Sequence, residues 1–154
     1  MNRSIRHRLL GLVSVLLVAA LAGCGSDGDE TTAATVSKAQ FIKQADAVCD
    51  KTEGRQLKRI EEFQKRQLPP GPKAERELVA FAGVPPLAIE AEELEELPLP
   101  SSGGDEAEAF IDAFRAGVAK AEEDPASMLS EKAYPFVRAT ELAREFGFKV
   151  CGGA

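Results

Sequence analysis

Cysteine has the most reactive side chain in this chain, and it occurs at positions 24, 49 and 151. The spacing most typical of a thiol redox site is Cys-x-x-Cys, and the sequence contains no such pair. A cysteine or serine nucleophile usually needs a histidine base, but the only histidine, His7, lies close to the N-terminus. The role of each cysteine therefore has to be inferred from the residues around it.

The N-terminal segment has the zones of a secretion signal. Arg3, Arg6 and Arg8 precede an uncharged and apolar run over residues 9–22. This run has 14 residues, whereas a membrane-spanning helix needs roughly 20. We therefore expect residues 1–23 to be a cleaved signal peptide rather than a permanent membrane span.

The apolar run ends in Leu21-Ala22-Gly23-Cys24, and this LAGC motif resembles the lipobox of bacterial lipoproteins. The resemblance implies that Cys24 becomes the first mature residue and carries a covalent diacylglyceryl lipid, with palmitate-type chains in the cell membrane. Two or three acyl chains anchor a protein firmly, whereas one does so only marginally. We expect no other cofactor and a location on the extracytoplasmic face. An ordinary secretory signal followed by an incidental cysteine is the alternative.

Two cysteines, Cys49 and Cys151, remain for the exported domain. An even number of cysteines in an oxidising compartment predicts a disulfide. The two positions lie 102 residues apart, and closing so long a loop stabilises a fold by about 4–5 kcal/mol in the chain-entropy description. A thiol redox site formed by the same pair is the alternative interpretation.

The composition of the mature chain excludes several classes of function. The signal contains three of the 19 basic residues and no acidic residue, which leaves 16 basic against 25 acidic side chains and a net charge of −9. No basic stripe with interleaved aromatic residues is present, so we expect no nucleic-acid partner. Without histidine after His7, Ser-His and Cys-His catalysis, histidine-ligated zinc and histidine-bound haem are excluded. We expect neither a metal site nor catalytic residues.

Three features could nevertheless form a binding site. The acidic run EAEELEEL from Glu90 could hold a cation, but calcium loops present their oxygens from a tight turn, so a solvated helix face is the favoured interpretation. Tyr134-Pro135-Phe136 could line a pocket, with plain core packing as the alternative. The Pro85-Pro86 pair and the loop PLPSS could present a partner surface, with an exposed turn as the alternative. The sequence does not indicate which residues bind a ligand.

The hydrophobic periodicity predicts an all-α fold. No segment shows sustained alternation of apolar and polar residues, and apolar residues recur at helical spacing. We expect four helices, over residues 37–67, 72–97 with a break near Pro85-Pro86, 103–122 and 125–147. Short loops favour an up-down four-helix bundle. The domains are then the signal peptide 1–23, the lipidated Cys24 with a flexible tether over 24–36, and a helical domain over 37–154.

Local signals set the ends of these helices. Ser37 and Gln40 predict a capping box, Ser102 and Asp105 mark the start of the third helix, and Asp124 followed by proline predicts an N-cap. The apolar stripe of the third helix is expected to consist of Ala107, Phe110, Ile111, Phe114, Val118 and Ala121. Pro135 should kink or split the last helix, which Gly147 should end. In the second helix, Leu87, Ala91 and Leu94 are expected to face inward and the glutamates from Glu90 onward mostly outward.

Two further segments carry a second resemblance. The AxxxC motif around Cys49 and the closing LAREFGFKVCG resemble small two-cysteine helical lipoproteins of high-GC Gram-positive bacteria. This resemblance supports the fold and the location and implies no mechanism.

These observations together favour a lipid-anchored interaction or scaffold module of the cell envelope, without catalysis and with an envelope protein as its possible partner. The main alternative is a binder of a small apolar or lipid-like molecule between helices. A weaker alternative is a carboxylate-dependent hydrolase of wall polymer, although no spacing in the sequence singles out a pair of carboxylates.

Overall fold

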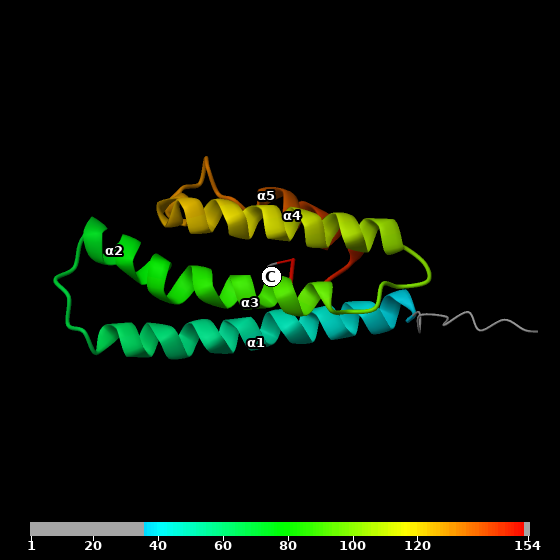
Figure 1. Cartoon of the computed structure of the whole chain (residues 1–154), viewed down its shortest axis with the longest axis horizontal. Coiled ribbons are helices and arrows are strands. Elements are labelled where there is room, and N and C mark those ends of the chain that lie inside the picture. The colour runs from blue at the N-terminus through cyan, green and yellow to red at the C-terminus, as the bar shows by residue number, and fades with distance from the viewer. Residues whose placement is uncertain (1–35, 153–154) are drawn as a thin grey trace, which may run out of the picture. The chain divides into compact units, whose positions relative to one another are not determined.

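A computed structural model describes residues 36–152 of the chain. The expected signal peptide, Cys24 and the tether up to residue 35 lie outside the described residues. In chain order the elements are α1 (Lys38–Gln64), α2 (Pro72–Leu78), the π-helical turn η1 (Val79–Gly83), α3 (Val84–Glu95), α4 (Gly104–Glu123), the 3₁₀ turn η2 (Pro125–Leu129) and α5 (Val137–Phe146). Figure 1 shows α1, α3 and α4 running side by side, with α5 packed on α4. The all-α class is confirmed.

Helix α1 begins as its sequence predicts. The Ser37 side chain accepts a hydrogen bond from the Gln40 backbone, and the Gln40 side chain accepts one from the Ser37 backbone, so the capping box is formed. The helix ends at Gln64, before the proline-rich turn. Just ahead of α1, Val36 forms an isolated bridge with Pro100, and its carbonyl accepts a hydrogen bond from Ser101 at 2.9 Å. The chain therefore enters the domain beside the loop that joins α3 to α4.

The expected interruption near Pro85-Pro86 takes the form of the π turn η1, which separates α2 from α3 directly before these prolines, while residues 72–95 stay helical throughout. Proline lacks a backbone N–H, so a proline in a helix leaves the carbonyl four residues earlier without its usual donor. The chain adapts with the π turn η1, in which the Val84 N–H donates to Val79. The Phe81 carbonyl, four residues before Pro85, accepts instead from the Arg59 side chain at 2.6 Å.

Helix α4 buries the apolar stripe that its periodicity predicts. Its buried side chains include those expected, namely Ala107, Phe110, Ile111, Phe114, Val118 and Ala121. The start of the helix differs from the prediction, because the N-cap is Gly103 rather than Ser102. Acidic Asp105 and Glu106 lie in the first turn, where they complement the positive end of the helix dipole.

The expected last helix, over residues 125–147, is split. Asp124 caps only the short turn η2, by accepting from the Ala126 N–H at 3.1 Å. The chain is not α-helical between η2 and α5, which begins after Phe136, so Pro135 lies in the split rather than at a kink. Gly147 ends α5 in the left-handed conformation at φ +105°, and the Phe148 N–H donates back to Ala143, which confirms the predicted stop.

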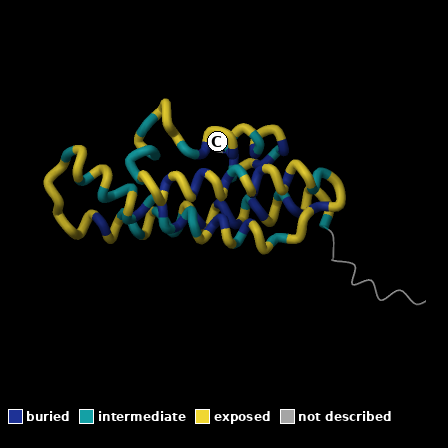
Figure 2. Tube along the Cα trace, turned by 45° about the horizontal axis from the view of Figure 1, so that its top comes forward, coloured by how far each residue is buried: buried dark blue, intermediate teal, exposed yellow. Residues whose placement is uncertain are grey.

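The core lies where α1, α3, α4 and α5 face one another, as the buried stretches in Figure 2 show. Phe41, Phe110, Phe146 and Phe148 form an aromatic cluster there, with ring centroids 4.7–6.0 Å apart in four of the pairs. The turn over residues 65–70 is exposed, and α2 has no buried residue. Over residues 36–152 we find no helix that combines the length and the apolar character needed to span a membrane.

Candidate functional site

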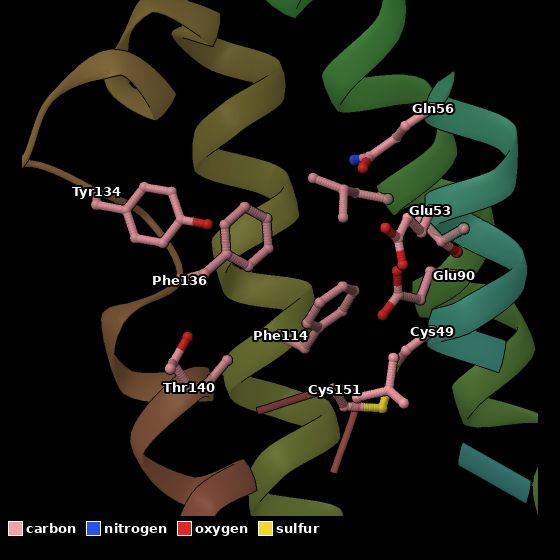
Figure 3. A pocket seen from close by; sticks show the side chains of 13 residues that line it. Cys49, Glu53, Gln56, Glu90, Phe114, Tyr134, Phe136, Thr140 and Cys151 are labelled. Carbon is pink, nitrogen blue, oxygen red and sulfur yellow. A yellow bond between two sulfur atoms is a disulfide. The ribbon is translucent and has the colours of Figure 1, made fainter. Parts of the chain in front are cut away.

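A pocket of about 230 Å³ opens between α1, α3, α4 and the segment that leads into α5. We call it the Glu90 pocket. Figure 3 shows its two walls, with acidic and polar side chains from α1 and α3 facing aromatic side chains from α4 and the segment before α5. The residues that matter most for its chemistry are Glu53, Glu90, Phe114, Tyr134, Phe136 and the disulfide Cys49–Cys151.

The polar wall comes from one face of α1 together with Glu90 of α3. Cys49, Thr52, Glu53 and Gln56 all line the pocket, because residues three, four and seven positions apart lie on the same side of a helix. Glu53 is exposed, whereas Glu90 is only 4 % exposed. One carboxyl group at the pocket is therefore solvated and the other is buried.

Burial is the main reason that the pKa of Glu90 rises to about 7. An ionised carboxylate loses its hydration inside a protein, so desolvation favours the protonated form. The Thr52 hydroxyl and the positive charge of Arg55 act in the opposite direction, and the charge of Glu93 adds slightly to the rise. Near neutral pH the protonated and ionised forms of Glu90 are thus both populated.

Arg55 does not neutralise Glu90, because its guanidinium group pairs with Glu93 instead. Both terminal nitrogens of Arg55 donate to the two Glu93 oxygens, and this hydrogen bonding lowers the pKa of Glu93. No lysine or arginine is among the residues that line the Glu90 pocket. The pocket therefore presents two carboxyl groups and no basic side chain.

The aromatic wall depends on a close approach between α4 and the segment before α5. A Cβ atom on Gly117 would lie 2.6 Å from the Phe136 ring, so only glycine lets this ring pack against α4. The Phe136 ring lies 5.2 Å from the Phe114 ring and 5.8 Å from the Tyr134 ring, measured between centroids. Partial burial raises the pKa of Tyr134.

The disulfide lies at the base of the pocket. Cys49 and Cys151 are bonded, with their Cα atoms 5.4 Å apart, and a carboxylate oxygen of Glu90 lies within 4.8 Å of both sulfur atoms. Sulfur atoms bonded to each other are not thiolates, and thiolates are the form that binds metals. These three groups therefore do not make a metal site while the disulfide is intact.

Asp46 holds the C-terminal tail beside this disulfide. Its carboxylate accepts hydrogen bonds from the backbone N–H groups of Lys149, Val150 and Cys151, at 2.9–3.2 Å. We call Asp46 and Cys49 of α1, together with residues 147–152, the tail junction. The tail junction holds the pocket-lining residues Val150 and Cys151 in place through both a covalent bond and backbone hydrogen bonds.

The opposite end of α1 has no role in the pocket. Arg59 and Arg66 lie over the Phe81 ring, 4.5 and 4.0 Å from its centroid, and the Phe63 ring lies 6.0 Å from that of Phe81. We call these four residues the hairpin end. The expected surface at Pro85-Pro86 is partly internal, because Pro86 is fully buried.

Sequence reasoning located one wall of the site and missed the other. Tyr134 and Phe136 line the pocket, as one of the two interpretations of that segment proposed. Glu90 was expected to face outward, and this is wrong. Leu87, Glu90, Ala91 and Leu94 share the spacing of one helix face, so the periodicity could have placed Glu90 inward. The neighbouring glutamates instead favoured the interpretation of the whole run, including Glu90, as a solvated helix face.

Helix α1 carries basic side chains opposite the acidic run on α3. The Arg55–Glu93 ion pair is the contact between them. Arg59, from the same basic segment, bonds to a backbone carbonyl instead. The carboxyl pair that the sequence did not single out is Glu53 with Glu90, which the fold brings to one pocket.

Comparison of the chain with family models, with curated proteins and with solved structures gave no match.

Proposed function

We propose that this chain is a lipid-anchored, extracytoplasmic binding domain that holds a small molecule in the Glu90 pocket and does not catalyse a reaction. The observation that carries this proposal is a buried carboxyl group at a solvent-open pocket with aromatic walls. Burying an ionisable group is costly, and a buried group with a perturbed pKa in a cleft is a candidate for a functional site. Small-molecule sites are usually clefts in which a few convergent polar groups orient the ligand against apolar side chains, and here polar groups of α1 and α3 face the aromatic wall.

The size of the pocket limits the size of the ligand. Its volume of about 230 Å³ is below the roughly 300–1,000 Å³ of pockets that hold drug-sized molecules. We therefore expect a ligand with a single ring or a short chain, rather than a complete lipid. The location rests on the sequence, since the basic segment, the short apolar run and the LAGC motif favour export and lipidation at Cys24.

The proposal is tested by asking what the protein carries when it is purified. The full chain is extracted from its native membranes in mild detergent, and bound small molecules are identified by native mass spectrometry. The variant Thr140→Phe introduces a large side chain at a residue that lines the pocket, whereas Glu141→Phe adds the same bulk at an exposed neighbouring position.

We expect a bound mass in the wild type and in Glu141→Phe, and its loss in Thr140→Phe. The extracted molecule should also raise the melting temperature of the wild type, because a ligand that binds only the folded state stabilises it. A protein that carries no ligand, and that no fraction of its native extract stabilises, would contradict the proposal.

An envelope interaction module is the second candidate function. It is favoured by the hairpin turn, where Leu68 and Pro69-Pro70 are exposed. Figure 1 shows this turn at the C-terminal end of α1, and the expected tether over 24–36 precedes the N-terminal end of the same helix. A lipid anchor at Cys24 would leave the turn accessible to another protein. Cross-linking in native membranes, with Cys24→Ser as the control, should capture a reproducible protein partner if this candidate is right.

A carboxylate-dependent hydrolase is the third candidate, favoured because Glu53 and Glu90 meet in one pocket. A glycosidase uses one protonated and one ionised carboxyl group. Burial raises the pKa of Glu90, whereas Glu53 is exposed to solvent. Release of soluble fragments from cell-wall polymer by the wild type, and by neither Glu53→Gln nor Glu90→Gln, would favour this candidate over binding alone.

A further inference from the structure

We infer that the Glu90 pocket selects an organic cation, a protonated amine on a small apolar body, whose ammonium group lies between the Glu53 and Glu90 carboxylates. This inference rests on the proposed binding function and names the class of ligand. Figure 3 shows both glutamates extending into the pocket from one wall and the Phe114 and Phe136 rings facing them from the other.

The charges around the pocket favour a cation over an anion or a neutral molecule. Two carboxyl groups line it and no basic side chain does. The nearest arginine, Arg55, is already bound to Glu93. An anionic ligand would meet like charge without a partner, whereas an ammonium group supplies the counter-charge that the buried Glu90 carboxylate lacks.

The aromatic wall fits the same ligand class. Phe114, Tyr134 and Phe136 form a continuous set of rings, with neighbouring centroids 5.2 and 5.8 Å apart. Aromatic faces attract ammonium groups through their quadrupole and also bury the apolar part of a ligand. Hydroxyl and amide groups from Thr52, Gln56 and Thr140 line the pocket as well and can accept hydrogen bonds from an ammonium group.

Cation binding should be coupled to the release of a proton from Glu90. The ionisable groups that face Glu90 are Glu53 and Arg55 from α1, Glu93 from its own helix and Tyr134 from the segment before α5. The pocket-lining residues of α4 and α5 are Phe114, Ala139 and Thr140, which do not titrate. Because the pKa of Glu90 is about 7, a cation that binds only the ionised form should bind about tenfold more weakly at pH 6 than at pH 8.

The chain contains its own reporter for this test, because Tyr134 is its only tyrosine and it has no tryptophan. Tyrosine fluorescence therefore reports on the pocket wall alone. The full chain is reconstituted in phosphatidylcholine vesicles and titrated with three probes of similar size, namely 2-phenylethylamine, neutral 2-phenylethanol and anionic phenylacetate. Protein-free vesicles give the correction for partitioning into lipid.

We expect the amine to bind at least tenfold more tightly than the alcohol or the acid, and its affinity to rise with pH. Glu90→Gln should abolish both the preference and the pH dependence, while Glu92→Gln, at an exposed position of the same helix, should change neither. Glu53→Gln should weaken the amine preference and keep the pH dependence. Melting curves of each variant show that its fold is intact.

Equal binding of the amine and the alcohol would overturn the inference and leave the proposed binding function in place. Binding of phenylacetate in preference to the amine, or a co-purified ligand without a basic nitrogen, would overturn it in the same way. No response to any of the three probes would also overturn it, and the mass-spectrometric search for a bound molecule then tests the binding function separately.

Discussion

The tail junction and the hairpin end both join α1 to a later segment of the chain, but they do so with different interactions. At the tail junction a disulfide and three backbone hydrogen bonds to Asp46 lie beside the aromatic cluster of the core. At the hairpin end, Arg59 and Arg66 stack on Phe81, and the adjacent α2 has no buried residue.

We expect the tail junction to be the more rigid of the two regions. Segments with few buried contacts open more readily than a buried core, and an exposed cation–π contact contributes only about 0.5–1 kcal/mol. We therefore expect slow hydrogen exchange at the tail junction and faster exchange in α2 and η1. The Glu90 pocket is built on the rigid side, since Cys49 and Cys151 are part of its lining.

The largest effect should come from removing the covalent link at the tail junction. The Cys49→Ala, Cys151→Ala double variant releases a loop of about a hundred residues in the unfolded state, so we expect a loss of about 4–5 kcal/mol at most in the free energy of unfolding. Urea unfolding measures this loss. Hydrogen exchange should then show a tail junction as open as the hairpin end. If protection from exchange at the tail junction were unchanged, the disulfide would not be the cause of the slower exchange expected at the tail junction than at the hairpin end.

The next effect concerns the cost of burying Glu90. The pKa of this carboxyl is raised from 4.5 to about 7, so the folded state binds a proton more tightly than the unfolded state. This stabilisation is complete below about pH 4.5 and is lost as the pH rises through about 7. The change that Glu90→Gln causes in the free energy of unfolding should therefore differ between the two pH values. It should be about 3 kcal/mol more stabilising at pH 8 than at pH 4. An identical effect at both pH values would contradict the raised pKa.

A smaller effect is expected from Asp46→Ala. This substitution leaves the N–H groups of Lys149, Val150 and Cys151 without their acceptor. A hydrogen bond to a charged group contributes about 1.5–3 kcal/mol to stability. Because the disulfide still holds the tail, we expect the free energy of unfolding to fall by about 2 kcal/mol. Urea unfolding of Asp46→Ala in the oxidised and reduced protein should show a larger loss after reduction. Asp50→Ala, one turn further along α1 and exposed, is the matched control.

The smallest effect should come from the hairpin end. Arg59→Leu removes the donor to the Phe81 carbonyl and the stacking on its ring, and we expect it to cost about 1 kcal/mol. Pro85→Ala restores a backbone N–H that can reach the same carbonyl. In a double-mutant cycle, Arg59→Leu should therefore cost less in the Pro85→Ala background. An equal cost in both backgrounds would show that Arg59 does not replace the missing donor.

Much of the fold follows from local sequence. The capping box at Ser37 and Gln40, the apolar stripe from Ala107 to Ala121 and the stop at Gly147 were each read from the order of residue types, and the structure has them. Such signals lie within a single helix or at its ends, so they are visible without knowledge of the tertiary structure. The pairing of the two cysteines was also expected, because they are the only two left for an exported domain.

The candidate site was less predictable, because it depends on contacts between distant segments. Glu90 is buried only because α3 turns it toward α1 and the disulfide, and the acidic run around it indicates a solvated face. The Phe81 carbonyl, next to Pro85-Pro86, accepts a hydrogen bond from Arg59, which lies 22 residues earlier in the chain. A local pattern carries no information about a donor so far away in sequence.

The helical class, most helix ends and the net negative charge follow from the sequence alone, because they depend on composition and on periodicity within single helices. Only the tertiary structure decided that Glu53 and Glu90 meet opposite Phe114 and Phe136 in one pocket, and that a buried carboxyl group lies beside the disulfide. The physical reason is that burial and the pKa of a group are set by everything packed around it, and these neighbours come from segments far apart in the chain.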